Sequence, residues 1–132
     1  MLRNIFGIVA GLMLGSVVNM TFVAISSSVV SPPAGADMTT IEGLTAAMPR
    51  MEPKHFVFPF LAHALGTLTA ALVAALVAVR HKMPIAMGIG GLFLVGGIAA
   101  SAMIPAPAWF IALDLIAAYL PMAWLGAKLG RA

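Results

Sequence analysis

Four long apolar stretches dominate this sequence, and each is long enough to cross a lipid bilayer as a helix. A membrane-spanning helix needs roughly 20 predominantly apolar residues. The stretches cover approximately residues 5–30, 56–79, 83–104 and 109–129. Because 62% of the 132 residues are hydrophobic and only 8% are charged, little sequence remains for an aqueous domain. We therefore predict an all-α polytopic membrane protein, folded as one domain in a four-transmembrane-helix bundle.

The first stretch has the outline of a secretory signal peptide. Arg3 precedes it, and the small residues Ala34-Gly35-Ala36 follow it. Its apolar run is longer than the roughly 7–15 residues of a signal-peptide core. We expect a retained transmembrane helix.

The positions of the charged residues predict the orientation. Basic residues flank one end of every stretch: Arg3, Arg80, His81, Lys82, Lys128 and Arg131. The other end has a mixed set: Asp37, Glu42, Arg50, Glu52 and Lys54. Loops rich in Lys and Arg stay in the cytoplasm. We therefore expect a bacterial-type inner (plasma) membrane, with both termini cytoplasmic and the loop 31–55 outside. The basic residues behind the net charge of +3 lie at the helix ends and form no separate basic face. We therefore expect no nucleic-acid partner.

The composition excludes several classes of site. The chain has no cysteine, which excludes disulfides, thiolate nucleophiles, Cys-ligated zinc and iron–sulfur clusters. No Walker A, GxSxG or dinucleotide-binding motif is present. The Gly88-Ile89-Gly90-Gly91 run lies inside an apolar stretch and is typical of helix packing. The sequence therefore assigns no catalytic residue and identifies no cofactor.

Small residues recur at a spacing of four in the first two stretches. They are Gly7, Gly11 and Gly15, and then Ala62, Gly66, Ala70 and Ala74. Such strips let helix backbones approach closely in a membrane. They predict tight helix packing, either within one subunit or between subunits, and a homo-oligomer or a larger membrane complex is an expected assembly.

Two irregular features are expected besides the spans. Thr39-Thr40-Ile41-Glu42 fits a capping box with Thr39 as N-cap, so we predict a short amphipathic helix over about residues 40–48 that stops at Pro49. This helix is either a plain connector or a lid over a site. Pro121 lies inside the fourth stretch and predicts a kink there.

Asp114 is the feature that most suggests a function. It is the only charged residue between Trp109 and Leu125, and a charge inside a bilayer costs roughly 2.5–3.5 kcal/mol on insertion scales. His63 lies at a similar depth in the second stretch, about 10 Å from its outer end. We therefore predict that the two side chains can meet.

Other polar residues surround this pair in the predicted topology. They are Glu52, His55, Asn19, Thr67 and Ser101. Three interpretations stay open: a structural pair that joins two helices, a ligand or proton site open to the outside, and metal ligation. The last is the weakest, because eight residues of helix, about 12 Å, separate His55 from His63. We expect no metal site.

In size and span count the chain resembles the small multidrug transporters. Those proteins carry a glutamate in the first helix, where this chain has Asn19, so no residue role is carried over. We expect a small integral membrane protein, oligomeric or an accessory subunit, whose outward-facing pocket around His63 and Asp114 binds a small ligand or proton. The alternatives are a proton-coupled small-molecule transporter with Asp114 as proton carrier and, less favoured, a membrane enzyme acting on lipid or quinone.

Overall fold

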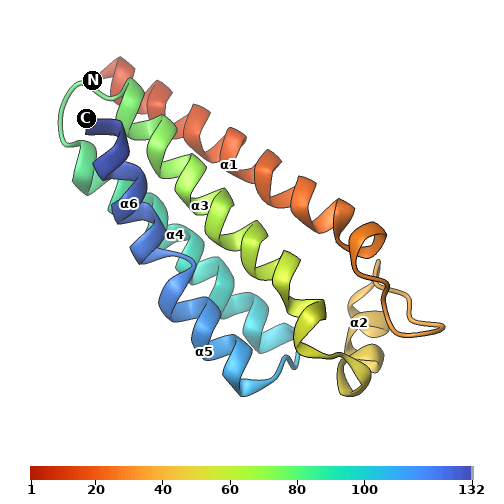
Figure 1. Ribbon diagram of the computed structural model, residues 1–132. Coiled ribbons are helices and arrows are strands. Elements are labelled where there is room, and N and C mark those ends of the chain that lie inside the picture. The colour runs from red at the N-terminus through yellow and green to blue at the C-terminus, as the bar shows by residue number, and fades with distance from the viewer. Residues whose placement is uncertain (132) are drawn as a thin grey trace.

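The computed structural model describes residues 1–131, and every regular element in this range is helical (Figure 1). In chain order the elements are α1 (Leu2–Val29), α2 (Ile41–Ala47), the 3-10 helices η1 (Met48–Arg50) and η2 (Pro53–Phe56), α3 (Val57–Val77), α4 (Lys82–Met103), α5 (Ala108–Ala117) and α6 (Leu120–Arg131). Figure 1 shows the long helices side by side, with both termini at one end and α2 at the other. The predicted all-helical architecture is confirmed.

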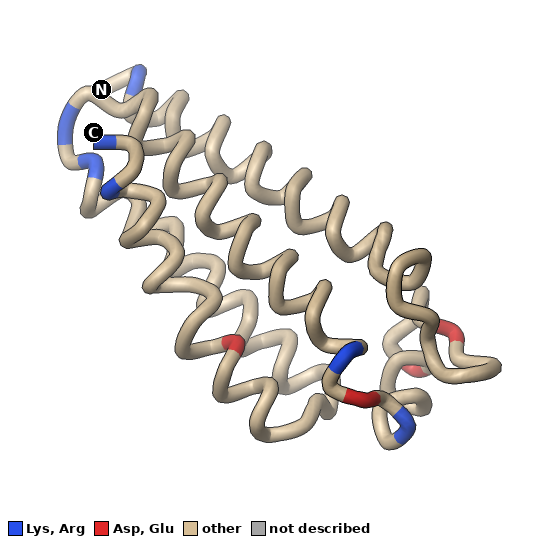
Figure 2. Tube along the Cα trace, viewed as in Figure 1, with Lys and Arg blue, Asp and Glu red and all other residues tan. Residues whose placement is uncertain are grey.

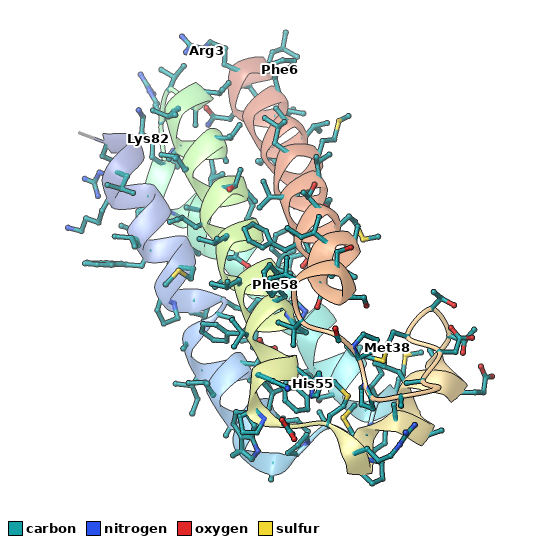
Figure 3. The ribbon with its side chains drawn as sticks, turned by 45° about the vertical axis from the view of Figure 1, so that its right-hand side comes forward. Arg3, Phe6, Met38, His55, Phe58 and Lys82 are labelled. Atoms are coloured by element: carbon teal, nitrogen blue, oxygen red, sulfur yellow. The ribbon has the colours of Figure 1, made fainter. Side chains whose placement is uncertain are left out.

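Four helical stretches are long and apolar enough to cross a membrane: Leu2–Val29, Pro53–Val77, Lys82–Met103 and Ala108–Arg131. The surface of α1 agrees with this, because its only buried residues are glycines. Large apolar side chains such as Phe6 and Met13 are about two-thirds exposed, and Figure 3 shows Phe6 pointing away from the bundle. Soluble monomers rarely expose contiguous apolar surface on this scale. These features indicate a membrane location.

The glycines of α1 pack directly on α3. A Cβ added at Gly15 would lie 2.6 Å from both the Gly66 carbonyl oxygen and the Ala70 Cβ. Gly7 and Gly11 face the next turns of α3, at Ala74 and Ala70. The small-residue strips of the first two spans therefore meet each other within the chain, at a backbone distance that only glycine and alanine permit.

The opposite face of α3 packs on α6 in the same way. A Cβ at Gly126 would lie 2.8 Å from the Leu68 carbonyl oxygen, and one at Gly130 would lie 2.7 Å from the Ala75 Cβ. The α4 helix packs on α6 and α3 but hardly touches α1. The α3 helix is thus the centre of the bundle, with α1 on one side and α4 and α6 on the other.

The fourth span is interrupted, where the sequence predicted only a kink. The α5 helix ends at Ala117, and α6 begins at Leu120, so that Pro121 is the second residue of a new helix. A proline inside a helix removes one hydrogen bond and clashes with the carbonyl four residues earlier, but it is tolerated in a first turn. The break therefore lies before the proline, at Ala118 and Tyr119.

The segment between α1 and α3 holds the short helices. The predicted cap at Thr39 was wrong by one residue, because the Thr40 hydroxyl accepts the hydrogen bond from the Gly43 N–H at 3.0 Å. Thr39 instead donates to Asp37 through its hydroxyl and its N–H, and this holds the pKa of Asp37 below its usual value. The short helix predicted over about residues 40–48 is present as α2, which ends at Ala47, and the 3-10 turn η1 then carries the chain past Pro49 to Arg50.

The two ends of the bundle differ in charge (Figure 2). Lys and Arg gather at the end that carries both termini, which we call the basic end: Arg3, Arg80, Lys82, Lys128 and Arg131. The opposite end, which we call the loop end, carries residues 30–56 and a mixture of both signs.

Candidate functional site

His63 and Asp114 are hydrogen-bonded across the bundle. His63 lies on α3 and Asp114 on α5, and Nδ1 of His63 is 2.8 Å from Oδ1 and 3.0 Å from Oδ2 of Asp114. A carboxylate only accepts hydrogen bonds, so Nδ1 is the donor. Asp114 is buried, at 5% exposure, whereas the His63 side chain keeps 29%. The pair therefore fixes the imidazole ring and leaves its second nitrogen, Nε2, accessible.

Tyr119 completes this arrangement. Its hydroxyl donates to Oδ2 of Asp114 at 3.2 Å, and its ring stacks on that of His63 with centroids 5.8 Å apart. The break between α5 and α6 places this residue, and Gly97 of α4 makes room for its ring. Sequence reasoning missed Tyr119. The available signal was that it is the only tyrosine in the chain, five residues after Asp114.

Thr67 supports His63 through the backbone. Its hydroxyl is fully buried and donates to the carbonyl oxygen of His63 at 2.7 Å. This is the common bond of a helical threonine to the residue four positions earlier. Thr67 therefore does not extend the hydrogen bonds of the imidazole itself.

A cavity of about 300 Å³ lies at the loop end, and we call it the loop-end cavity. His63 and Asp114 contribute to its inner wall, and Ser101 lines it while donating its hydroxyl to the Ile98 carbonyl at 2.7 Å. Its outer side is apolar and formed largely by Met38, Leu44, Met48, Met51 and Phe56. Methionine side chains adapt to irregular shapes. This cavity suits a small, mainly apolar ligand with one polar group.

His55 also lines the loop-end cavity but has both ring nitrogens occupied. Its Nδ1 accepts from the Glu52 N–H at 2.8 Å, so Nε2 is the donor to the Ser31 carbonyl oxygen 3.0 Å away. Figure 3 shows His55 at the loop end, with Met38 on the neighbouring segment. Glu52 is exposed and pairs with Lys54 at 3.4 Å. His55 and Glu52 therefore hold the loop together and are not joined to His63.

A second cavity, of about 220 Å³, lies on another side of His63, and we call it the lateral cavity. Its walls come from α1, α3 and α4 and from Tyr119 at the break between α5 and α6, and they include Asn19, His63, Gly96 and Gly97. Three residues line both cavities: His63, Gly97 and Ala100. The imidazole ring of His63 therefore lies between the lateral cavity and the loop-end cavity.

Over residues 1–131, no three His, Cys, Asp or Glu side chains converge in a way that could hold a metal ion. Comparisons with family models, curated proteins and solved structures found no match to the chain. The geometry around His63 is therefore the feature of this chain that points to a function.

Proposed function

We propose that this chain is an integral membrane protein whose four long helices cross the bilayer, with the basic end in the cytoplasm and the loop end outside. The clustering of Lys and Arg at one end supports this orientation, since such residues are retained on the cytoplasmic side. The exposed apolar side chains of α1 support contact with lipid.

Within this topology, the chain binds a small ligand at His63, and it works as an oligomer or as an accessory subunit of a larger membrane complex. One observation carries the proposal. Asp114 orients His63 through Nδ1, Tyr119 holds Asp114, and Nε2 remains accessible in the wall of two cavities. A buried polar network of this kind is costly in a membrane unless it is fully bonded. Here it presents a single oriented nitrogen to a ligand.

The test is native mass spectrometry of the protein purified from its own membranes in mild detergent. We expect a small bound molecule on the wild type that is lost from His63→Phe and weakened in Asp114→Asn, which keeps the shape of the side chain. Ser101→Ala is the matched control, because its hydroxyl lines the same cavity but already bonds the helix backbone. Equal occupancy in the wild type and in a folded His63→Phe variant would refute the proposal. The same spectra report the oligomer and any partner subunit.

Proton-coupled transport is the second candidate, favoured by the short contact between a carboxylate and an imidazole. In this case Asp114 carries the proton. Proteoliposomes containing the wild type should then dissipate an imposed pH gradient when substrate is present, and Asp114→Asn should not. If Asp114→Asn lowers only thermal stability, the pair is a structural link between α3 and α5.

A further inference from the structure

The side of the bundle is open between α1 and α4. Both helices pack on α3 but barely touch each other, and the lateral cavity lies between them. Its rim includes Ser16 and Gly96, which are both exposed. Ser16 lies halfway along α1. In the proposed topology this opening therefore faces the hydrocarbon core of the bilayer.

Three polar groups at this opening have no partner among the described residues: the Ser16 hydroxyl on its rim, and the Asn19 carboxamide and Nε2 of His63 farther in. The Asn19 carboxamide makes no hydrogen bond in residues 1–131, and Nε2 of His63 makes none either. Asn19 lies beside α3, because a Cβ added at Gly66 would be 3.1 Å from the Asn19 Cβ. Gly66 is one helical turn from His63. A polar group without a hydrogen bond is strongly disfavoured in hydrocarbon, so a polar group from outside the chain is the expected partner.

We propose that the ligand of His63 is a bilayer-dissolved amphiphile with a hydroxyl head group, and that it enters sideways between α1 and α4. This inference rests on the proposed function and adds the class of ligand and its route. Nε2 is an acceptor when His63 is neutral and a donor when it is protonated. A hydroxyl has one donor and two acceptor lone pairs. With neutral His63 it can donate to Nε2 and accept from the Asn19 amide N–H, and with protonated His63 it can accept from Nε2–H and donate to the Asn19 amide oxygen.

The sizes of the cavities agree with an amphiphile. Ligand pockets typically measure roughly 300–1,000 Å³. The lateral cavity, at about 220 Å³, is below this range and suits a head group and the first part of a chain. The loop-end cavity, at about 300 Å³, continues beyond His63 with mainly apolar walls. A molecule that arrives from the bilayer can therefore place its polar group at His63.

Photolabelling tests the route. The probe is a diazirine analogue of dodecanol, added to phosphatidylcholine vesicles that contain the full-length protein, with labelled peptides mapped by mass spectrometry. We expect labelling near Asn19 and Gly97 that dodecanol suppresses at least about tenfold more effectively than dodecyl methyl ether, the loss expected when one hydrogen bond is removed. An ether oxygen only accepts, so it lacks the donor.

Two glycines of α4 provide a matched pair of variants. A Cβ added at Gly96 or at Gly88 meets no atom within 4 Å, so a side chain can begin at either position without a clash at its first carbon. Only Gly96 lines the lateral cavity. Gly96→Leu should abolish the suppressible labelling, and Gly88→Leu should preserve it. Unchanged labelling in Gly96→Leu, or equal suppression by the ether, would overturn the inference. If the ligand found on the purified protein still depends on His63 in that case, the proposed function stands and only the lateral route fails.

Discussion

Gly97→Ala is the most direct test of how the site is held together. The added methyl would lie 2.6 Å from the hydroxyl oxygen of Tyr119 and 2.8 Å from two of its ring carbons. Ordinary carbon contacts begin near 3.5 Å, so the ring must retreat by about 0.7–0.9 Å. The Tyr119 hydroxyl is already 3.2 Å from Asp114, at the long end for such a bond. We therefore expect the substitution to break this hydrogen bond.

The expected magnitude is a loss of about 1–2 kcal/mol in the free energy of unfolding. Overpacking of a well-packed position typically costs about 1–3 kcal/mol. The lost hydrogen bond adds about 0.6 kcal/mol, the average for such bonds in membrane proteins. The higher helix propensity of alanine offsets up to about 1 kcal/mol of this.

The measurement is reversible unfolding in mixed micelles with increasing dodecyl sulfate, followed by tryptophan fluorescence. The adjacent substitution Gly96→Ala is the control, because its methyl meets no atom within 4 Å and should be neutral or slightly stabilising. Tyr119→Phe removes the hydrogen bond without the clash, so its free energy of unfolding should fall only by about 0.6 kcal/mol, the contribution of that bond. If Gly97→Ala unfolds at the same dodecyl sulfate concentration as Gly96→Ala, the contact between Gly97 and Tyr119 does not hold the site together.

Two further substitutions test the packing and the loop. Gly15→Leu should separate α1 from α3 and lower the free energy of unfolding by at least about 3 kcal/mol, because the new side chain would meet the backbone of α3. Gly91→Leu is the control in the same unfolding assay and should be tolerated, because a Cβ at this position meets no atom within 4 Å. His55→Ala removes the hydrogen bond to the Ser31 carbonyl, which joins the two ends of the loop, together with the local bond from the Glu52 N–H. Limited trypsin digestion between α1 and α3 should therefore be faster in intact proteoliposomes. Ser31→Ala keeps the accepting carbonyl and should match the wild type, and a digestion rate in His55→Ala equal to that of Ser31→Ala would show that these bonds do not hold the loop.

Much of the fold follows from features that are local in the sequence. Uninterrupted apolar runs of sufficient length predict the spans, because length and polarity alone decide whether a helix suits a bilayer. The depth of His63 and Asp114 followed from counting residues along each helix, and the two side chains do lie within hydrogen-bonding distance. Counting residues gives the depth of a side chain but not the direction in which it points around the helix axis. That direction determines that Asn19 lines the same cavity as His63.

The errors arose where two local signals compete. Thr39 and Thr40 are both good caps, and the choice depended on Asp37, which binds Thr39 and leaves Thr40 to the helix. Tyr119 was overlooked because its role comes from the position of the helix break. A proline shows only within about one helical turn where a helix will break. The exact position of the break at residues 118 and 119 goes with the packing of the Tyr119 ring against Gly97 of α4.

Because the fourth span is interrupted, its two halves, α5 and α6, should tolerate different kinds of substitution. The α6 helix is held by backbone proximity, with Gly126 and Gly130 pressed against α3, so almost any enlargement there should be excluded whatever its chemistry. The α5 helix is held by side chains, through Asp114 and the contact of Phe110 with Phe56, whose ring centroids are 4.7 Å apart. Variation in α5 should therefore be limited by chemical type, and in α6 by volume. In a library of random substitutions across this span, the tolerated residues should therefore share a chemical type before residues 118 and 119 and a small volume after them.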